Sequence, residues 1–245
     1  MLSWLYFCVT WLLAGVVTGL TSFGGNLFAV PLITLAMPPR EAILFGTLSG
    51  SAIFLGMAVV YLRHILWRET AILTVSALGG IPLGVWFLAN AGARALLLAA
   101  AAALSLFLLW QFAAGLLHRR ERPLPLWCAA PFGLLSGTMM SAVSFGGPPL
   151  VLYAFLRHWQ KTETLGTVNA VSIAIMAFVI PWLAHKGLFA GELPLLGLAG
   201  SLAAFVGIAV SVPLARRLAT GFFRRLLLGM LVLSAIMLFW RGFAA

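Results

Sequence analysis

Long apolar segments follow one another along almost the entire chain, and short connections that carry most of the charges separate them. Only 8% of the 245 residues are charged and 63% are hydrophobic, whereas a soluble domain carries about 25% charged residues. Many segments reach the roughly 20 residues that a spanning helix needs, and none shows the alternation of a membrane β-barrel. The sequence therefore predicts an all-α, polytopic membrane protein of the cell (inner) membrane.

The apolar segments divide into five in each half of the chain. In the first half they are expected at about 3–21, 25–37, 41–62, 70–89 and 94–117. In the second half they are expected at about 124–143, 147–157, 163–184, 193–215 and 223–243. The segments 25–37 and 147–157 are shorter than the roughly 17 residues that a crossing requires. We expect them to be half-helices or re-entrant segments, which leaves about eight spanning helices.

The sequence Ser-Phe-Gly-Gly occurs once in each half, beginning at Ser22 and at Ser144, and each copy leads into a short segment. The two halves align at this same offset, which predicts a first repeat at 1–117 and a second at 124–245, joined by the polar linker 118–123. Because five is an odd number of segments, the two repeats are expected to be inverted relative to each other. This parity holds even if each short segment folds back on its neighbour.

The basic residues indicate the orientation, because cytoplasmic loops are enriched in Lys and Arg. The richer predicted side collects Arg63, Arg68, Arg119, Arg120, Arg122, Arg157, Lys161, Arg216, Arg217, Arg224 and Arg225. The other side collects Arg40, Arg94, Lys186 and Arg241. The central linker is therefore predicted to be cytoplasmic, and both termini non-cytoplasmic. The net charge of +10 reflects topology in this setting, and no nucleic-acid partner is expected.

Backbone breaks repeated inside a membrane protein are the main sequence indication of a transporter binding site. No Lys or Arg lies in the middle of a predicted span, so an anion would have to bind helix N-termini and polar side chains. Glycine allows sharp turns and close approach of a ligand, and the two serines occupy predicted N-cap positions. Pro148 has no N–H group, so the second copy offers fewer donors than the first. The candidate substrate-binding residues at the breaks are Ser22, Phe23, Gly24, Gly25, Asn26, Ser144, Phe145, Gly146 and Gly147.

Further candidates lie near the start of the third segment of each half. Thr47 and Thr167 are repeat partners, and Asn169 lies within one turn of Thr167. Such side chains bind ligand or join neighbouring helices, and both roles stay open. Glu41 and Glu163 also occupy corresponding positions, so they are candidates for proton coupling; the alternative is that each stabilises the helix N-terminus that it begins.

The glycine-rich break after the first helix, the Pro31-Leu32 pair that follows, the second copy of the break and the basic central linker resemble the sulfite exporter TauE/SafE family. The resemblance covers nearly the whole chain. It differs at the break, where the family often has three consecutive glycines and this chain has two. The resemblance implies transport, usually outward, of small anions such as sulfite and organosulfonates.

We therefore predict a permease that exports a small anion by alternating access. The alternatives are an anion channel and a membrane assembly subunit that carries no flux. An intramembrane enzyme is disfavoured, because the chain has no Asp and no apparent cluster of reactive residues. No cofactor and no metal are expected. The expected partners are the anionic substrate and the lipid bilayer, and both a monomer and a homodimer fit the sequence.

Overall fold

The computed structural model describes residues 2–21, 24–113, 123–215 and 220–244. These residues form ten α-helices and two short 3₁₀ helices, and they contain no strand. The first half contains α1 (Leu2–Thr21), α2 (Gly25–Ile33), α3 (Pro39–Val60), η1 (Leu62–His64), α4 (Trp67–Asn90) and α5 (Ala93–Ala113). The second half contains η2 (Leu126–Cys128), α6 (Ala129–Val143), α7 (Gly147–Leu156), α8 (Lys161–His185), α9 (Leu193–Ala215) and α10 (Thr220–Ala244). The all-helical prediction is confirmed, with five α-helices in each half.

Prolines explain the two largest differences from the predicted boundaries. The segment expected at 25–37 is helical only to Ile33, and residues 34–37 form turns before Pro38 and Pro39. A residue that precedes proline is disfavoured in the helical conformation, so the helix ends early. The segment expected from 124 begins as a helix only after the extended Pro125, through the 3₁₀ helix η2.

Five helices of the described residues are long and apolar enough to cross a membrane. These spans are Pro39–Val60, Trp67–Asn90, Leu126–Val143, Lys161–His185 and Leu193–Ser211. Within the described residues α1, α5 and α10 contribute shorter apolar stretches, and α7 contributes the ten residues Gly147–Leu156. The chain is thus built as a multi-pass membrane protein, while the count of eight spanning helices stays a prediction.

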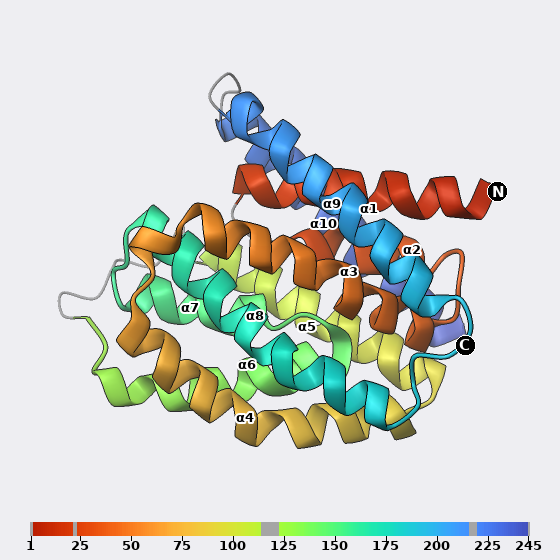
Figure 1. The fold of residues 1–245 in the computed structure, drawn as a ribbon, viewed down its shortest axis with the longest axis horizontal. Coiled ribbons are helices and arrows are strands. Elements are labelled where there is room, and N and C mark those ends of the chain that lie inside the picture. Colours follow the sequence, from red (N-terminus) through yellow and green to blue (C-terminus); the bar gives the residue numbers. More distant parts are fainter. Residues whose placement is uncertain (1, 22–23, 114–122, 216–219, 245) are drawn as a thin grey trace.

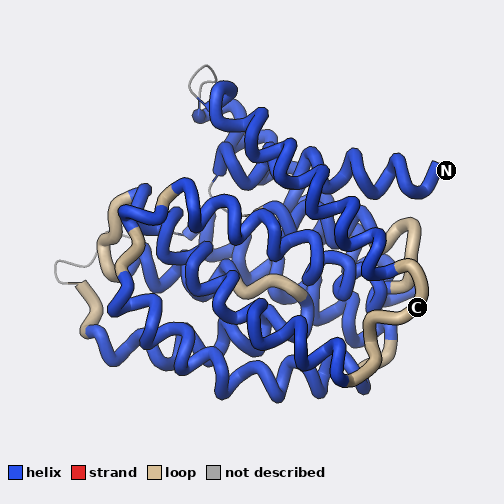
Figure 2. The backbone as a smooth tube through the Cα atoms, in the orientation of Figure 1, coloured by secondary structure: helices blue, strands red, loops and turns tan. Residues whose placement is uncertain are grey.

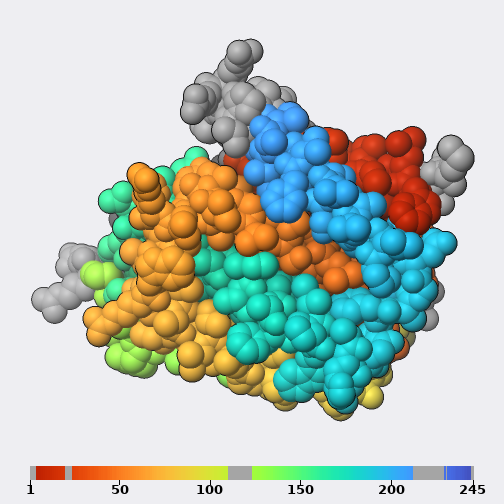
Figure 3. Space-filling view, viewed as in Figure 1, coloured from red at the N-terminus to blue at the C-terminus, as the bar shows by residue number. Residues whose placement is uncertain are grey.

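The main helix pairs form a pattern that is unchanged when the two halves are exchanged. The first helix of each half packs against the fourth helix of the other, as α1 does on α9 and α6 on α4. The third helix of each half also packs against the fourth helix of the other half, so that α3 contacts α9 and α8 contacts α4. The exchange leaves the α3–α8 and α5–α10 pairs unchanged. Figure 3 shows α8 lying between α3 and α4 on one face of the bundle.

Polar contacts assign the loops to the two ends of the bundle. Arg241 of α10 donates to the carbonyl of Thr34, and Arg40 of α3 donates to the carbonyl of Ala91 at 3.0 Å. These contacts define the terminal end, where Figure 1 also places both chain termini. At the opposite end, here the linker end, the backbone N–H of Leu124 donates to the carbonyl of Leu156.

Small residues allow α4 and α6 to approach closely. A Cβ atom built on Gly80 would lie 2.6 Å from the Thr138 hydroxyl and 2.8 Å from the Thr138 nitrogen. On the facing helix, a Cβ on Gly137 would lie 2.8 Å from the carbonyl carbon of Ala77. Lipid tails are as apolar as the side chains, so helix association in a membrane depends on such close packing. Helices α1 and α9 also approach closely at two glycines, Gly15 and Gly207.

We predict that Gly80→Ala lowers the free energy of unfolding by about 1–3 kcal/mol, the usual cost of overpacking. The matched control is Gly79→Ala on the next residue, where the new Cβ would meet only the flexible end of Leu134 at 3.2 Å. That control should be neutral or slightly stabilising, because Ala favours helix over Gly. Unfolding of the purified variants in detergent tests the pair, and equal midpoints would contradict the packing argument.

Candidate functional site

The second break lies inside the bundle. The C-cap of α6 is Ser144, directly after the last helical residue. It adopts the left-handed conformation (φ 64°) and donates its backbone N–H to the carbonyl of Met140 at 3.0 Å. Residues 144–146 are not helical, and α7 begins at Gly147. Figure 2 shows a non-helical stretch midway along the bundle, away from the loops at the two ends. Ser144 is therefore the C-cap of α6, and the prediction that it caps the following helix is wrong: the N-cap of α7 is Gly146.

Glycine shapes the first break. Gly24 is the N-cap of α2 with φ 102°, a conformation that other residues rarely adopt, and the Phe28 N–H makes the first helical bond to its carbonyl at 2.9 Å. The N–H groups of Gly25, Asn26 and Leu27 therefore have no acceptor within the helix. Ser22 and Phe23, the first two residues of this break, lie outside the described residues.

Each short helix folds back along the helix that precedes it. A Cβ on Gly25 would lie 2.5 Å from the Thr18 hydroxyl and 3.1 Å from the carbonyl of Ala14. In the second half, a Cβ on Gly146 would meet Met140 and the carbonyl of Ser136, and the Ser136 hydroxyl donates to the Gly146 carbonyl at 2.7 Å. Ala14 and Ser136 correspond at the repeat offset, as do Thr18 and Met140. The two breaks therefore pack on matching positions of the preceding helices, although the contacting glycines differ by one position, since Gly25 corresponds to Gly147.

The two breaks meet through Asn26. Its side-chain amide donates to the Ser144 hydroxyl at 2.8 Å, to the Ser144 carbonyl at 3.2 Å and to the Gly46 carbonyl of α3 at 3.3 Å. Asn26 is 5% exposed and Ser144 is 1% exposed. Gly50 makes room, because a Cβ there would lie 2.5 Å from the amide nitrogen of Asn26. Gly46 and Gly50 lie near the middle of α3, so the breaks meet in the interior of the bundle.

The Asn26 contact leaves polar groups for a ligand. The side-chain oxygen of Asn26 is buried and has no hydrogen-bond partner among the described residues. A Cβ built on Gly24 or on Gly147 would meet no atom of the described residues within 4 Å, so unfilled space adjoins each break. The breaks thus offer the first backbone N–H groups of α2 and the Ser144 hydroxyl as donors beside unfilled space, and such donors bind a small oxyanion without a cation. The free oxygen of Asn26 is an acceptor and does not bind the oxygens of an anion.

The remaining candidates at the second break and on α3 and α8 have structural roles in this conformation. Phe145 is 1% exposed and packs in the core. The Thr47 hydroxyl donates to the Ile43 carbonyl one turn back, and the Asn169 amide does the same to Leu165. The Thr167 hydroxyl accepts the N–H of Leu66 at 3.0 Å, so it holds the connection between α3 and α4.

The two predicted coupling carboxylates lie at helix starts. Glu41 is in the first turn of α3 and is exposed. Glu163 forms a capping box with Gln160, whose backbone N–H it accepts at 2.7 Å. For Glu163 the capping alternative is confirmed.

Sequence reasoning missed a buried carboxylate at the linker end. Glu69 of α4 is 6% exposed and forms an ion pair with Arg157, the residue that ends α7. The hydroxyl of Tyr153 donates to the same carboxylate at 2.6 Å. The sequence predicts only a topological role for Arg157. The two residues of the pair are 88 positions apart, so no local pattern indicates that they meet.

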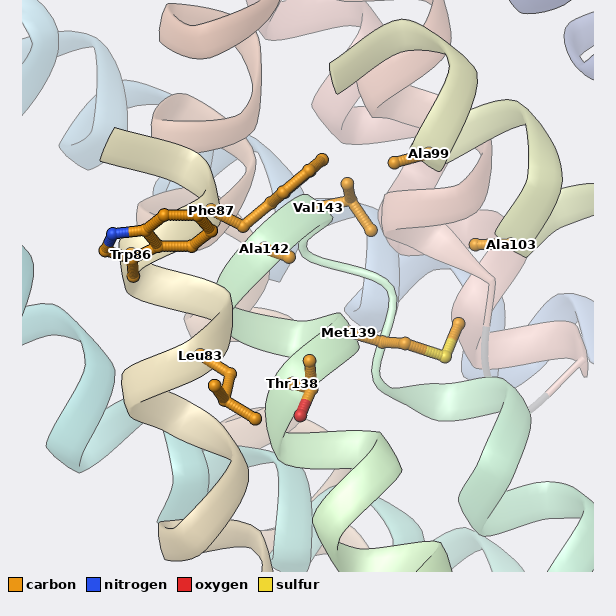
Figure 4. A pocket seen from close by; sticks show the side chains of 9 residues that line it. All are labelled: Leu83, Trp86, Phe87, Ala99, Ala103, Thr138, Met139, Ala142 and Val143. Carbon is orange, nitrogen blue, oxygen red and sulfur yellow. The ribbon is translucent and has the colours of Figure 1, made fainter. Parts of the chain in front are cut away.

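An apolar cavity of about 310 Å³ lies beside the second break (Figure 4). Its walls come from α4, α5 and α6, and include Trp86, Phe87, Met139 and Val143. Thr138 is the single polar residue among those that line it, and its hydroxyl donates to backbone carbonyls. The cavity cannot stabilise an anion, so the polar break itself remains the candidate site.

We predict that Asn26→Ala lowers the free energy of unfolding by about 1–3 kcal/mol, because the buried carbonyls of Ser144 and Gly46 lose their donor. Asn90→Ala is the matched control, since Asn90 is exposed and its amide donates to the carbonyl of Trp86 one turn back. The control should stay within about 0.5 kcal/mol of the parent. Comparable losses in both variants, measured by unfolding in detergent, would contradict a bridging role for Asn26.

Comparison with known proteins supports the resemblance seen in the sequence. The model of the family described as sulfite exporter TauE/SafE matches residues 7–238. No curated protein and no solved structure matches the chain. Because the match covers nearly all 245 residues, the chain belongs to the sulfite exporter TauE/SafE family, whose members are membrane transporters.

Proposed function

We propose that this protein exports a small oxyanion, sulfite or an organosulfonate, and binds it where the two helix breaks meet. The contact between Asn26 and Ser144 carries the proposal, because it joins the breaks of both halves in the interior of the bundle. The family supplies the class of substrate. We infer that an entering anion accepts hydrogen bonds from the first N–H groups of α2 and from the hydroxyl of Ser144.

The charges are distributed as an anion carrier requires. In the described helices and connections, every Lys and Arg lies in a loop or within the first or last two turns of a helix. A permanent cation at the centre would hold an anion tightly and would be costly to bury. Backbone dipoles and neutral polar groups bind more weakly, and weak binding permits release on the far side.

We infer alternating access between inverted repeats, with 1–117 and 124–245 as the repeats and 118–123 as their linker. The exchange of helix partners between the halves supports the inference, since each half packs its first helix on the other half. We place the linker end in the cytoplasm, because Arg63, Arg68, Arg157 and Lys161 belong to it. Both termini then face away from the cytoplasm, and the inside-negative membrane potential favours anion exit.

The direct test is flux through purified protein in liposomes, with sulfite, sulfoacetate, sulfate and chloride as the ions. Saturable flux of sulfite or sulfoacetate with counterflow is the expected result. Flux that does not saturate and shows no counterflow would instead indicate an anion channel. A folded protein that moves none of the four anions would overturn the proposal.

We predict that Gly147→Leu abolishes this flux while the unfolding midpoint stays near that of the parent. The new side chain would enter the unfilled space at the break, where the Cβ meets no atom within 4 Å. Gly229→Leu is the matched control, because Gly229 also has open space at its Cβ position but is an exposed residue of α10. The control should transport normally. Gly25→Leu is a poorer probe, because its Cβ would clash with Thr18 and destabilise the fold.

If Gly147→Leu transports at the rate of the parent, the anion does not pass the second break, and the proposed location is wrong. If both leucine variants lose flux together, the effect is not specific to the break.

A further inference from the structure

The linker end contains a preformed group of hydrogen-bond donors around a carboxylate. The Arg157 guanidinium donates to one oxygen of Glu69 through Nε at 3.0 Å and through Nη2 at 2.5 Å. Tyr153 donates to the other oxygen at 2.6 Å. Tyr153 and Arg157 lie four residues apart on α7, so both side chains project from one face of that helix.

We propose that Arg157 and Tyr153 form an entry site for the transported oxyanion, and that the carboxylate of Glu69 occupies this site as a stand-in while the path is closed. This inference rests on the proposed function for the identity of the anion. A guanidinium recognises the oxygens of a carboxylate, a sulfite or a sulfonate in the same way, through charge-assisted hydrogen bonds. An arriving anion can therefore replace Glu69 on the same donors.

The site opens onto a polar cavity of about 560 Å³ at the linker end. Its lining includes both members of the ion pair and five further polar or aromatic residues, namely Trp67, Arg68, His158, Trp159 and Glu163. The Nε2 atom of His158 is buried without a hydrogen-bond partner among the described residues. Because α7 ends and α4 and α8 begin here, the cavity faces the water-exposed end of the bundle. It is therefore placed to admit an anion from that side.

Displacement of Glu69 has a mechanical consequence, because the ion pair joins the two halves of the chain. Glu69 lies in the first turn of α4 in the first half, while Arg157 is the C-cap of α7 in the second half. Arg157 also donates to the carbonyl of Leu124 through Nη1, so it holds the start of the second half as well. α7 begins at the second break, which therefore lies about 15 Å from Arg157 at 1.5 Å per helical residue. An anion that takes the place of Glu69 thus frees the hairpin that carries the central site.

Cys128 provides a native reporter for this release. It precedes α6, is partly exposed and lies four residues after Leu124, whose carbonyl accepts a hydrogen bond from Arg157. The chain has only two cysteines, so a Cys8→Ser background leaves Cys128 as the single thiol. The experiment measures the rate of Cys128 alkylation by a polar maleimide in detergent, with sulfoacetate as the anion, because sulfite itself reacts with maleimides.

Glu69→Gln should increase the alkylation rate several-fold, since it removes the charge that holds Arg157 but keeps the size of the side chain. In the parent, sulfoacetate should displace Glu69 and raise the alkylation rate toward that of this variant, whereas chloride at equal ionic strength should not. In Glu69→Gln/Arg157→Gln the rate should stay high and sulfoacetate should have no effect. Glu192→Gln is the matched control, because Glu192 is an exposed glutamate just before α9, the counterpart of α4. It should behave as the parent.

An alkylation rate in Glu69→Gln equal to that of the parent would overturn the proposal, as would an effect of sulfoacetate on the rate that persists without Arg157. If Glu69→Gln does not fold, Tyr153→Phe serves as the second variant. It removes one donor, and it should raise the rate and weaken the response to sulfoacetate. An unchanged rate would again overturn the proposal. The alkylation assay needs no transport, so an absence of flux with the expected alkylation pattern would count against the exporter and leave the entry site standing.

Discussion

The structure depends on satisfying backbone polar groups where two helices break inside the membrane. A lipid bilayer offers no water to unpaired N–H and C=O groups, so irregular backbone survives there only when the protein encloses it. At the second break the Ser144 N–H bonds back to α6, the Gly146 carbonyl accepts the Ser136 hydroxyl, and Asn26 covers the Ser144 carbonyl from the other half. The same bonds that make the break tolerable also fix how the two halves meet.

The two copies of Ser-Phe-Gly-Gly have different backbones because different residues follow them. The first leads into Asn26, and its Gly24 adopts a left-handed conformation that leaves three N–H groups at the start of α2. The second leads into Pro148 and Pro149, which have no N–H, and there Ser144 takes the left-handed conformation. One break therefore supplies donors, and the other supplies a hydroxyl and a carbonyl. The two proposed repeats therefore meet in an asymmetric junction, in which Asn26 connects the two breaks.

The helices could be predicted from the sequence because length, apolar composition and proline act locally. The length of α7 and the stop of α2 before Pro38 and Pro39 follow from residues within a few positions. The contacts of the site are not local: Asn26 and Ser144 are 118 residues apart, and Thr167 meets Leu66 only after α3 and α8 have packed. A hydroxyl in an apolar helix looks the same in sequence whether it binds a ligand or a neighbouring loop. The geometry therefore had to separate Thr167, which holds a loop, from Ser144, which lies at the break.

The proposed path has a full positive charge at its entrance and only neutral hydrogen-bond donors at its centre. This arrangement keeps the strong binding group of a carrier apart from the weak ones. A guanidinium attracts an anion from water, but an anion held by it at the centre would leave slowly. Here the guanidinium of Arg157 lies at the mouth, and Glu69 neutralises it until an anion competes. The centre contains a hydroxyl and helix N–H groups, which orient an oxyanion without a full opposite charge. α7 connects the two proposed sites. Replacement of Glu69 by an anion at the linker end therefore moves the second break at the centre as part of the same motion.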